Sequence, residues 1–150
     1  MGKLDGRVAI ISGGARGQGA EEAKLFAREG AKVVFGDIRD DEGRQVEAEI
    51  QELGGEAVYV HLDVTSETEW QKVVQDTLAR YGRLDILVNN AAIIVPRVDI
   101  ENTAAEDWDR VFEVNAKSVF LGTKHCIPAM RDSGGGSIVN ISSVAGIAQS

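Results

Sequence analysis

The sequence contains little cysteine or proline, no run of basic residues and no long apolar run, and these shortages exclude several classes of protein. Its single cysteine, Cys126, cannot form a disulfide within the chain. Its 2 prolines and 17 glycines lie far from the composition of collagenous or low-complexity proteins. Apolar residues make up 43% of the 150 residues, close to the usual share for a chain that buries a hydrophobic core. We therefore expect a single globular domain over residues 1–150.

Acidic residues outnumber basic ones, with 24 Asp and Glu against 16 Lys and Arg, and the formal net charge is −8. Because affinity for phosphate backbones comes largely from clustered Lys and Arg, we expect no nucleic-acid partner. No apolar run approaches the roughly 18 residues that cross a bilayer, so we expect no membrane partner. Residues 1–6 lack an apolar signal segment, and a cytoplasmic location is therefore predicted.

Short β-branched runs alternate with stretches of helical spacing along the whole chain. This alternation predicts repeated strand–helix units and an α/β fold with an open parallel sheet. The run Val8–Ile11 is apolar at every position, as expected for a strand covered by helices on both faces. Strands are predicted over residues 8–11, 32–36, 57–62, 84–89 and 137–141, and helices over residues 19–29, 41–53, 66–81 and 104–131.

Local signals refine where two of these helices begin and where one is interrupted. Ser66 with Glu69, and Thr103 with Glu106, match the capping box that opens a helix. The last helical stretch is long, and its apolar pattern allows a break into two helices near Val114.

A glycine-rich loop over residues 12–19 joins the first predicted strand to the first predicted helix. There, unpaired amides and the positive end of the helix dipole can bind a pyrophosphate, provided that no Cβ blocks its approach. The glycines meet that steric requirement, although a tight turn alone would also need them. The candidate cofactor-binding residues of this loop are Gly13, Arg16, Gly17, Gln18 and Gly19.

Asp37 lies at the end of the second predicted strand, where a carboxylate can accept hydrogen bonds from an adenosine ribose. With its neighbour Ile38, it is a candidate for binding the adenosine end of a dinucleotide; a helix cap or a solvated loop acid is the alternative. Since a carboxylate repels the extra phosphate of NADP, we predict NAD as the cofactor, although Arg16 could pair with a phosphate. We predict no metal site.

Five motifs follow in order along the whole chain. They are Gly13-x-x-x-Gly17-x-Gly19, Asp63-Val64, Asn89-Asn90-Ala91-Ala92, Asn115 and Ser137-Ile138-Val139-Asn140-Ile141-Ser142-Ser143. Together they resemble the short-chain dehydrogenase/reductase family. The resemblance implies a Rossmann-like open parallel sheet with strand order 3-2-1-4-5, truncated before the later strands of the family.

The resemblance implies further cofactor-binding residues. Asp63 and Val64 would border the adenine ring, with the acid accepting from its exocyclic amine; a loop carboxylate before the next helix is the alternative role for Asp63. Asn90 and Ala91 resemble part of the family's Asn-Asn-Ala-Gly stretch, which would stabilise the sheet beside the cofactor. Ala92 stands where the family usually has glycine, and we expect the backbone to tolerate its methyl group.

The resemblance also implies two catalytic residues. Asn115 would hold a water of the proton relay through its backbone, whereas a helical asparagine taken alone is usually a kink or a satisfied polar residue. Ser143 would polarise the substrate carbonyl by a hydrogen bond to the developing alkoxide. Its neighbour Ser142 is the alternative candidate for that role.

The reaction of the family also needs a Tyr-x-x-x-Lys motif, in which the lysine lowers the tyrosine pKa. The chain has only Tyr59 and Tyr81, and Asp63 and Asp85 stand at the lysine positions. We therefore expect the motif to lie beyond Ser150, and the 150 residues to be the N-terminal part of a longer dehydrogenase.

The first functional hypothesis is an oxidoreductase that transfers a hydride between NAD(H) and a secondary alcohol or ketone, competent only in the longer chain. Steroid, cyclic-alcohol and 3-oxoacyl substrates are the classes implied. A non-catalytic NAD-binding module is the alternative, and the Asn-Asn-Ala and Ser-Ser elements disfavour a methyltransferase. For the full-length protein the resemblance implies a homotetramer, with part of the dimer surface on residues 104–131 and poor assembly of the 150 residues alone.

Overall fold

A computed structural model describes residues 2–95 and 99–144 of the chain. These residues form one sheet in the order β3-β2-β1-β4-β5, in which every neighbouring pair of strands is parallel. The predicted α/β class, the open parallel sheet and its strand order are confirmed. The strands are β1 (Val8–Ser12), β2 (Lys32–Asp37), β3 (Glu56–His61), β4 (Ile86–Asn89) and β5 (Ser137–Asn140).

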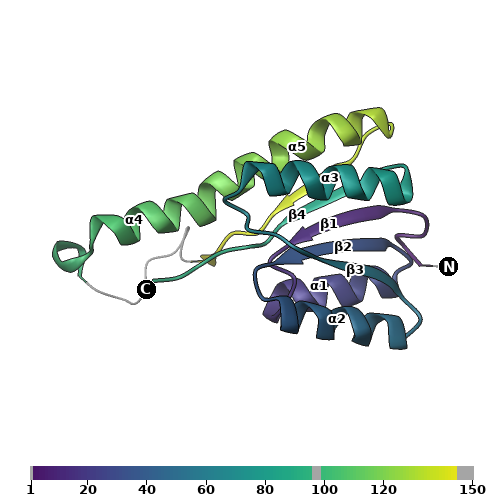
Figure 1. The fold of residues 1–150 in the computed structure, drawn as a ribbon, viewed down its shortest axis with the longest axis horizontal. Coiled ribbons are helices and arrows are strands. Elements are labelled where there is room, and N and C mark those ends of the chain that lie inside the picture. The colour runs from purple at the N-terminus through teal and green to yellow at the C-terminus, as the bar shows by residue number, and fades with distance from the viewer. Residues whose placement is uncertain (1, 96–98, 145–150) are drawn as a thin grey trace.

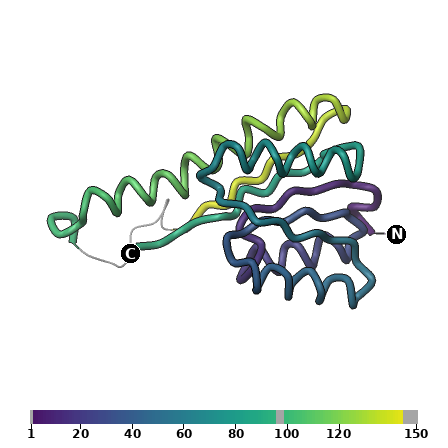
Figure 2. Tube along the Cα trace, viewed as in Figure 1, coloured from purple at the N-terminus to yellow at the C-terminus, as the bar shows by residue number. Residues whose placement is uncertain are grey.

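Helices cover both faces of this sheet, with α1 and α2 on one face and α3 and α5 on the other (Figure 1). The tube in Figure 2 shows the same layers, with α4 extending beyond the sheet. A π-helical turn, η2, separates α4 from α5, which confirms the break predicted near Val114. The helices are α1 (Gly17–Arg28), α2 (Asp40–Glu52), α3 (Glu67–Tyr81), the 3-10 helix η1 (Ile100–Asn102), α4 (Ala105–Phe112), η2 (Glu113–Lys117) and α5 (Ser118–Asp132).

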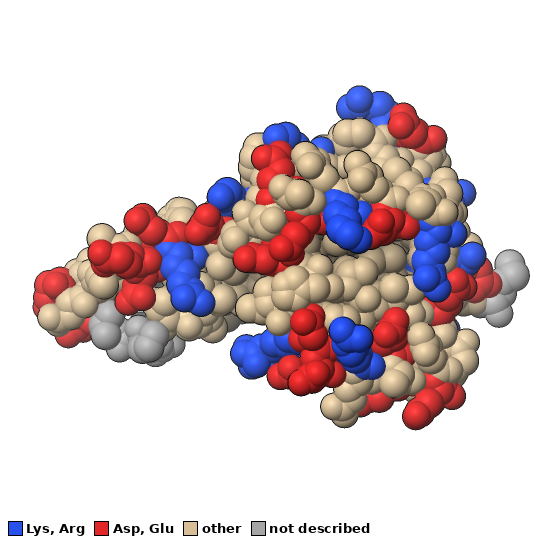
Figure 3. Space-filling view, viewed as in Figure 1, with Lys and Arg blue, Asp and Glu red and all other residues tan. Residues whose placement is uncertain are grey.

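The surface is mixed in charge. Figure 3 shows acidic and basic side chains interspersed over the face in view, without a continuous basic patch. In residues 2–95 and 99–144, no helix combines the length and the apolar character needed to cross a membrane.

Each face of the sheet has its own hydrophobic core, because successive strand side chains point to opposite faces. Ile10 and Trp70 are fully buried on the face covered by α3 and α5, and Ile11 and Phe35 on the face covered by α1 and α2. Cys126 of α5 belongs to the first core, and burial raises the pKa of its thiol to about 12. The two cores explain why Val8–Ile11 of β1 is apolar at every position.

The start of α3 follows the predicted capping box only in part. Ser66 Oγ accepts a hydrogen bond from the Glu69 amide at 3.3 Å, as predicted. The Glu69 carboxylate accepts instead from the amide of Asp63, at 2.6 Å, and so fixes the loop before the helix. One side chain thus connects the helix start to a candidate adenine-binding residue.

The capping box predicted for Thr103 and Glu106 is wrong. The N-cap residue of α4 is Ala104, and no side-chain bond caps this helix. Thr103 Oγ1 donates at 3.3 Å to the carbonyl of Asp99, which directly precedes η1. The hydroxyl therefore closes the turn before α4 rather than capping the helix.

Asp85, which directly precedes β4, is a buried carboxylate with only 3% of its surface exposed. It accepts hydrogen bonds from the Val8 amide at 2.9 Å, Arg83 Nε at 2.8 Å and Arg7 Nη1 at 3.0 Å. Burial alone would raise the pKa of Asp85, but the bonds from Arg83, Val8 and Arg7 outweigh it and lower the pKa to about 2. The carboxylate thereby joins the beginnings of β1 and β4.

Asp85→Asn should lower the free energy of unfolding at pH 7 by about 2 kcal/mol, the equivalent of the downward pKa shift. Because the folded-state pKa lies below the ordinary value, this stabilisation is complete above about pH 4 and is lost as the pH falls toward 2. Guanidinium unfolding measured between pH 7 and pH 2 checks this. The free energy of unfolding of the variant should fall less over this pH range than that of the wild type. Asp76→Asn, at an exposed pair with Lys72, should change stability little. Equal stability of Asp85→Asn and the wild type at pH 7 would contradict the prediction.

Candidate functional site

The glycine-rich loop turns between β1 and α1 at the carboxyl edge of the sheet. Gly13 and Gly17 have φ angles of 70° and 55°, in the left-handed region that favours glycine. A Cβ on Gly19 would overlap the carbonyl oxygen of Gly13, whereas nothing lies within 4 Å of a Cβ on Gly17. The loop is therefore tightly packed on its inner side and open at Gly17, where α1 begins.

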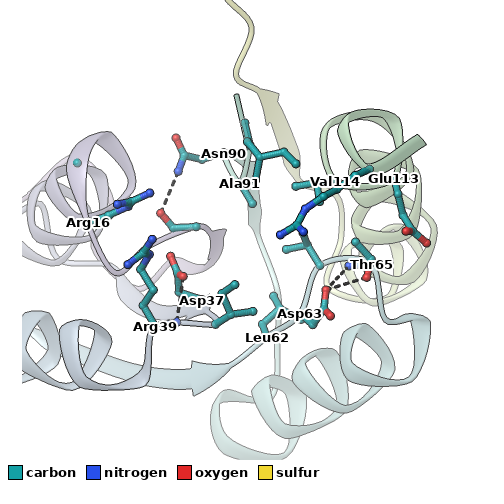
Figure 4. Close-up of a pocket in the computed structure, with 17 residues that line it drawn as sticks. Arg16, Asp37, Arg39, Leu62, Asp63, Thr65, Asn90, Ala91, Glu113 and Val114 are labelled. Atoms are coloured by element: carbon teal, nitrogen blue, oxygen red, sulfur yellow. Dashed lines mark hydrogen bonds between the residues drawn. The ribbon is translucent and has the colours of Figure 1, made fainter. Parts of the chain in front are cut away.

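Side-chain hydrogen bonds join this loop to the end of β4. Ser12 Oγ accepts from the amides of Asn90 and Ala91, each at 3.1 Å. Asn90 Nδ2 in turn donates to the carbonyl oxygen of Ser12 at 3.1 Å. It also donates to the carbonyl oxygen of Gly13 at 3.1 Å, the bond drawn from Asn90 in Figure 4. Ala92 follows with a negative φ, so its methyl group causes no backbone strain, as expected. The ends of two adjacent strands are thus held as one wall.

Asp37 connects the glycine loop to the turn between β2 and α2. One carboxylate oxygen accepts from the Ala15 amide at 3.2 Å, and the other accepts from the Arg39 amide at 3.2 Å. Figure 4 places Arg16, Arg39 and Asp37 together on one side of a cavity. A carboxylate in this place can accept hydrogen bonds from a bound polyol, and two guanidinium groups stand beside it.

The cavity has a volume of about 650 Å³, and its lining comes mainly from the loops that follow the strands. A cleft outside the carboxyl ends of parallel strands is where open α/β sheets bind ligands. Most of the cofactor-binding residues predicted from the sequence meet there. These are Gly13, Arg16, Gly17, Asp37, Ile38, Asp63, Val64, Asn90 and Ala91.

Two residues predicted to bind the cofactor lie outside the lining. Gln18 is exposed on α1, where its Nε2 donates to Glu22 Oε1 at 2.9 Å. Gly19 is buried against Gly13 and Asn90, so its place in the motif reflects packing of the loop. Helical geometry explains both positions, because the chain has already turned into α1 there.

Asp63 lies on the opposite side of the cavity from Asp37 (Figure 4). Its Oδ1 accepts from the amide of Thr65 at 2.9 Å and from the Thr65 hydroxyl at 2.8 Å. Asp63 therefore acts as a loop carboxylate before α3, which is the alternative role named for it from the sequence. Its Oδ2 takes part in no hydrogen bond among the described residues, and both Asp63 and Val64 line the cavity.

Asn115 lies within the π-helical turn η2 and clamps the loop after β4. Its Oδ1 accepts from the Ile93 amide at 2.8 Å, and its Nδ2 donates to the Ile93 carbonyl at 2.9 Å. Ile93 lines the cavity, whereas Asn115 does not. The side chain thus has a positioning role, while the water-binding role predicted for its backbone concerns other atoms.

Ser143 is exposed and lies just after β5, outside the residues that line the cavity. Neither tyrosine lines the cavity. Burial raises the pKa of Tyr81 at the end of α3, and burial together with the neighbouring Asp40 raises that of Tyr59. Neither phenol is therefore a proton acceptor at neutral pH within the described part of the chain.

Sequence reasoning missed part of the lining. Arg39 and Thr65 directly follow residues that were predicted, so proximity to a strand end was the available signal. Arg110, Glu113 and Val114 share one helical face across α4 and η2. No local pattern indicates that this face meets the loops after β2 and β3. Only the packing of α4 and η2 in three dimensions brings them to the cavity.

The profile of the short chain dehydrogenase family matches residues 7–150. The chain belongs to this family. Its cavity at the carboxyl edge and its parallel sheet are thus features of a family member, and the resemblance inferred from the motifs is confirmed.

Two curated relatives cover nearly the whole chain. A cyclopentanol dehydrogenase of Comamonas sp. (strain NCIMB 9872) is 46% identical over 147 residues, which are 98% of this chain and 58% of the relative. A 3-alpha-(or 20-beta)-hydroxysteroid dehydrogenase of Mycobacterium tuberculosis (strain ATCC 25618 / H37Rv) is 47% identical over 147 residues, 98% of this chain and 55% of the relative. The chain thus spans just over half the length of these relatives.

A solved structure gives the same picture of the fold. The 7 alpha-hydroxysteroid dehydrogenase complexed with NADH and 7-oxo glycochenodeoxycholic acid has a TM-score of 0.92 and 39% identity. The match covers 98% of this chain and 57% of that chain. The backbone that forms the cavity is therefore shared with a protein that binds a dinucleotide.

Proposed function

We propose that the full-length protein is an oxidoreductase that transfers a hydride between NAD(H) and a secondary alcohol or ketone. The observation that carries this proposal is the cavity in which Asp37 and the open amino end of α1 meet. The relatives named as cyclopentanol and hydroxysteroid dehydrogenases, and a solved neighbour with NADH, support it. Cyclic alcohols and steroids are the substrate classes we favour, ahead of 3-oxoacyl compounds.

The residues of the cavity fit a dinucleotide. A pyrophosphate needs amides at a helix start without a Cβ in the way, and Gly17 leaves that space open at α1. Asp37 and Ile38 would hold the adenosine ribose, and Asp63 and Val64 would border the adenine. When bound, NAD(H) would supply the hydride acceptor or donor.

The charge of Asp37 favours NAD over NADP. A carboxylate accepts from ribose hydroxyls but repels a phosphate attached to the same ribose. Arg16 and Arg39 act in the opposite direction because a guanidinium attracts phosphate. Arg39 is already paired with Glu42 at 3.3 Å, which reduces its attraction for an anion. NAD is therefore the proposed cofactor.

For the catalytic step we assign Ser143 to the substrate oxygen and Asn115 to the proton relay. Oxidation of an alcohol removes a hydride from the carbon and a proton from the hydroxyl. A serine hydroxyl that donates to the developing alkoxide would stabilise it. Asn115 would contribute through its backbone in η2, while its side chain fixes Ile93 in the cavity wall.

A non-catalytic NAD-binding module is the second candidate. It is favoured by one observation: neither Tyr59 nor Tyr81 lies in the cavity lining. Binding of NADH without turnover by the full-length protein would support this candidate over the first.

We further propose a homo-oligomer, with the tetramer as the expected form of the full-length protein. Support comes from exposed aromatic side chains on α4 and α5, where Trp108 stacks on Phe112 at 4.5 Å between ring centroids. Phe120 on α5 is 60% exposed. Large exposed aromatic side chains on one helical stretch are typical of protein–protein contacts.

A cytoplasmic location remains a prediction from the sequence.

The cofactor proposal predicts that the full-length protein binds NADH at least about tenfold more tightly than NADPH. Asp37→Ala should weaken NADH binding by about tenfold, since it removes charge-assisted hydrogen bonds to the ribose. It should also reduce the ratio between the affinities for NADH and NADPH. Isothermal calorimetry with both nucleotides measures this. Asp41→Ala removes an exposed acid of α2 outside the cavity and should leave both affinities unchanged. Tighter binding of NADPH to the wild type would refute the preference.

The catalytic proposal predicts that Ser143→Ala in the full-length protein lowers kcat with cyclopentanol by about 10²-fold to 10³-fold. The KM for NAD should stay unchanged, because the hydroxyl is assigned to the substrate. NADH formation followed by absorbance measures both constants. Ser142→Ala should retain turnover. Loss of turnover in Ser142→Ala together with wild-type turnover in Ser143→Ala would instead assign the role to Ser142.

The assembly proposal predicts that Phe120→Asp reduces the mass of the full-length oligomer, because a charge would be buried in the contact. Light scattering measures the mass. Leu53→Asp, at a residue 82% exposed just after α2, is the matched control and should leave the mass unchanged. A monomeric wild type would end the proposal.

A further inference from the structure

A hydrogen-bonded cluster lies directly behind the turn that carries Asp37. Tyr59 Oη is 2.6 Å from the Asp37 carbonyl oxygen and 2.8 Å from Asp40 Oδ1, so its single hydrogen is shared between two oxygens. His61 Nδ1 lies 2.9 Å from the same carboxylate oxygen of Asp40. Two side chains of β3 thereby hold both ends of the segment from Asp37 to Asp40.

The sheet and its core fix the position of these side chains. In the parallel pairing of β2 with β3, His61 stands opposite Asp37 and Tyr59 opposite Phe35. The rings of Phe35 and Tyr59 lie 5.6 Å apart. A Cβ on Gly43 of α2 would overlap the Tyr59 ring, so the ring is enclosed from that side as well. The Tyr59 ring is therefore held by β3, Phe35 and α2, and its hydroxyl has a fixed position beside the turn.

Charge favours the ionised form of the central carboxylate. Bonds from His61 and then Tyr59 lower the pKa of Asp40, and Arg44 adds to this. The pKa of His61 is raised, first by Asp40 and then by the nearby Glu69 and Asp63. Since a carboxylate only accepts hydrogen bonds, both Tyr59 and His61 donate to it.

The segment held in this way forms one end of the cavity. Asp37, Ile38 and Arg39 line it, and the Asp37 carboxylate points to the glycine loop through the Ala15 amide. Tyr59 and His61 lie outside the lining, so they can act on a bound ligand only through the turn. A shift of the turn would move three lining residues together.

We propose that Tyr59, through its hydroxyl and with Asp40, is a positioning residue that sets the Asp37 turn for the adenosine ribose of the cofactor. The proposal rests on the function proposed above. Loss of the hydroxyl leaves the Asp37 carbonyl with the bond from the Leu62 amide at 3.0 Å alone, and Asp40 with the bond from His61 alone. The ring stays in place, so the turn is held by fewer hydrogen bonds and is less well ordered for binding.

The test is a double-mutant cycle in the full-length protein, with NADH affinity measured by calorimetry. Tyr59→Phe should weaken NADH binding by about fivefold, the equivalent of one lost hydrogen bond. In the Asp37→Ala background the same change should have a clearly smaller effect, because the carboxylate that the turn presents to the ribose is already absent. ADP-ribose, which carries the adenosine end, should lose affinity by the same factor as NADH.

Tyr81→Phe is the matched control, since the Tyr81 hydroxyl bonds to Arg80 at the end of α3, away from the cavity. It should bind NADH as the wild type does. Asp40→Asn is the second variant and should weaken binding in the same direction, provided that its thermal midpoint confirms folding. In turnover assays, Tyr59→Phe should raise the KM for NAD and leave kcat unchanged.

Two results would overturn the inference. The first is wild-type affinity of Tyr59→Phe, and the second is an equal loss of affinity with and without Asp37, which would mean a general structural role. Failure of the wild-type protein itself to bind NADH would instead refute the proposed function, and with it the inference that depends on it.

Discussion

All five strands of the described sheet run parallel, and this one constraint determines where a ligand can bind. Parallel strands end at the same edge, so the loops after β1, β2, β3 and β4 meet around one cavity. The same constraint buries both faces of the sheet and demands helices on each. The apolar central strands and the polar residues that follow them are therefore two results of one arrangement.

The cavity walls differ in how they are held. The wall made by the ends of β1 and β4 depends on Ser12 and Asn90, whose hydrogen bonds run between side chains and backbone. The wall made by the turn after β2 depends on the bond from the Ala15 amide to the Asp37 carboxylate on the cavity side. On the side of β3 it depends on the bond from the Tyr59 hydroxyl to the Asp37 carbonyl. The first wall is braced within the strand ends, whereas the second is braced from a neighbouring strand. Ligand contacts on the second wall are thus more sensitive to residues that never touch the ligand.

Much of the fold and part of the site could be predicted from local sequence. Val8–Ile11 read as a doubly covered strand because apolar side chains filled both faces, and Asp37 was found because it ends a strand after a glycine loop. Thr103 failed as a cap because its hydroxyl bonds within the preceding turn, which the capping pattern does not encode. Gln18, which was predicted to bind the cofactor, lies outside the lining because the chain has already turned outward with α1 at that position. Arg110 and Val114 reach the cavity through tertiary packing, for which local patterns carry no signal.

Cys126 is the single cysteine of the chain, and its thiol lies in the hydrophobic core. Cys126 is fully buried between α5 and the sheet, and its raised pKa keeps it protonated at physiological pH. A thiol in this state reacts with modifying reagents only when the surrounding core opens. The rate of its modification therefore follows the opening of the core around α5, and no cysteine needs to be introduced for the measurement.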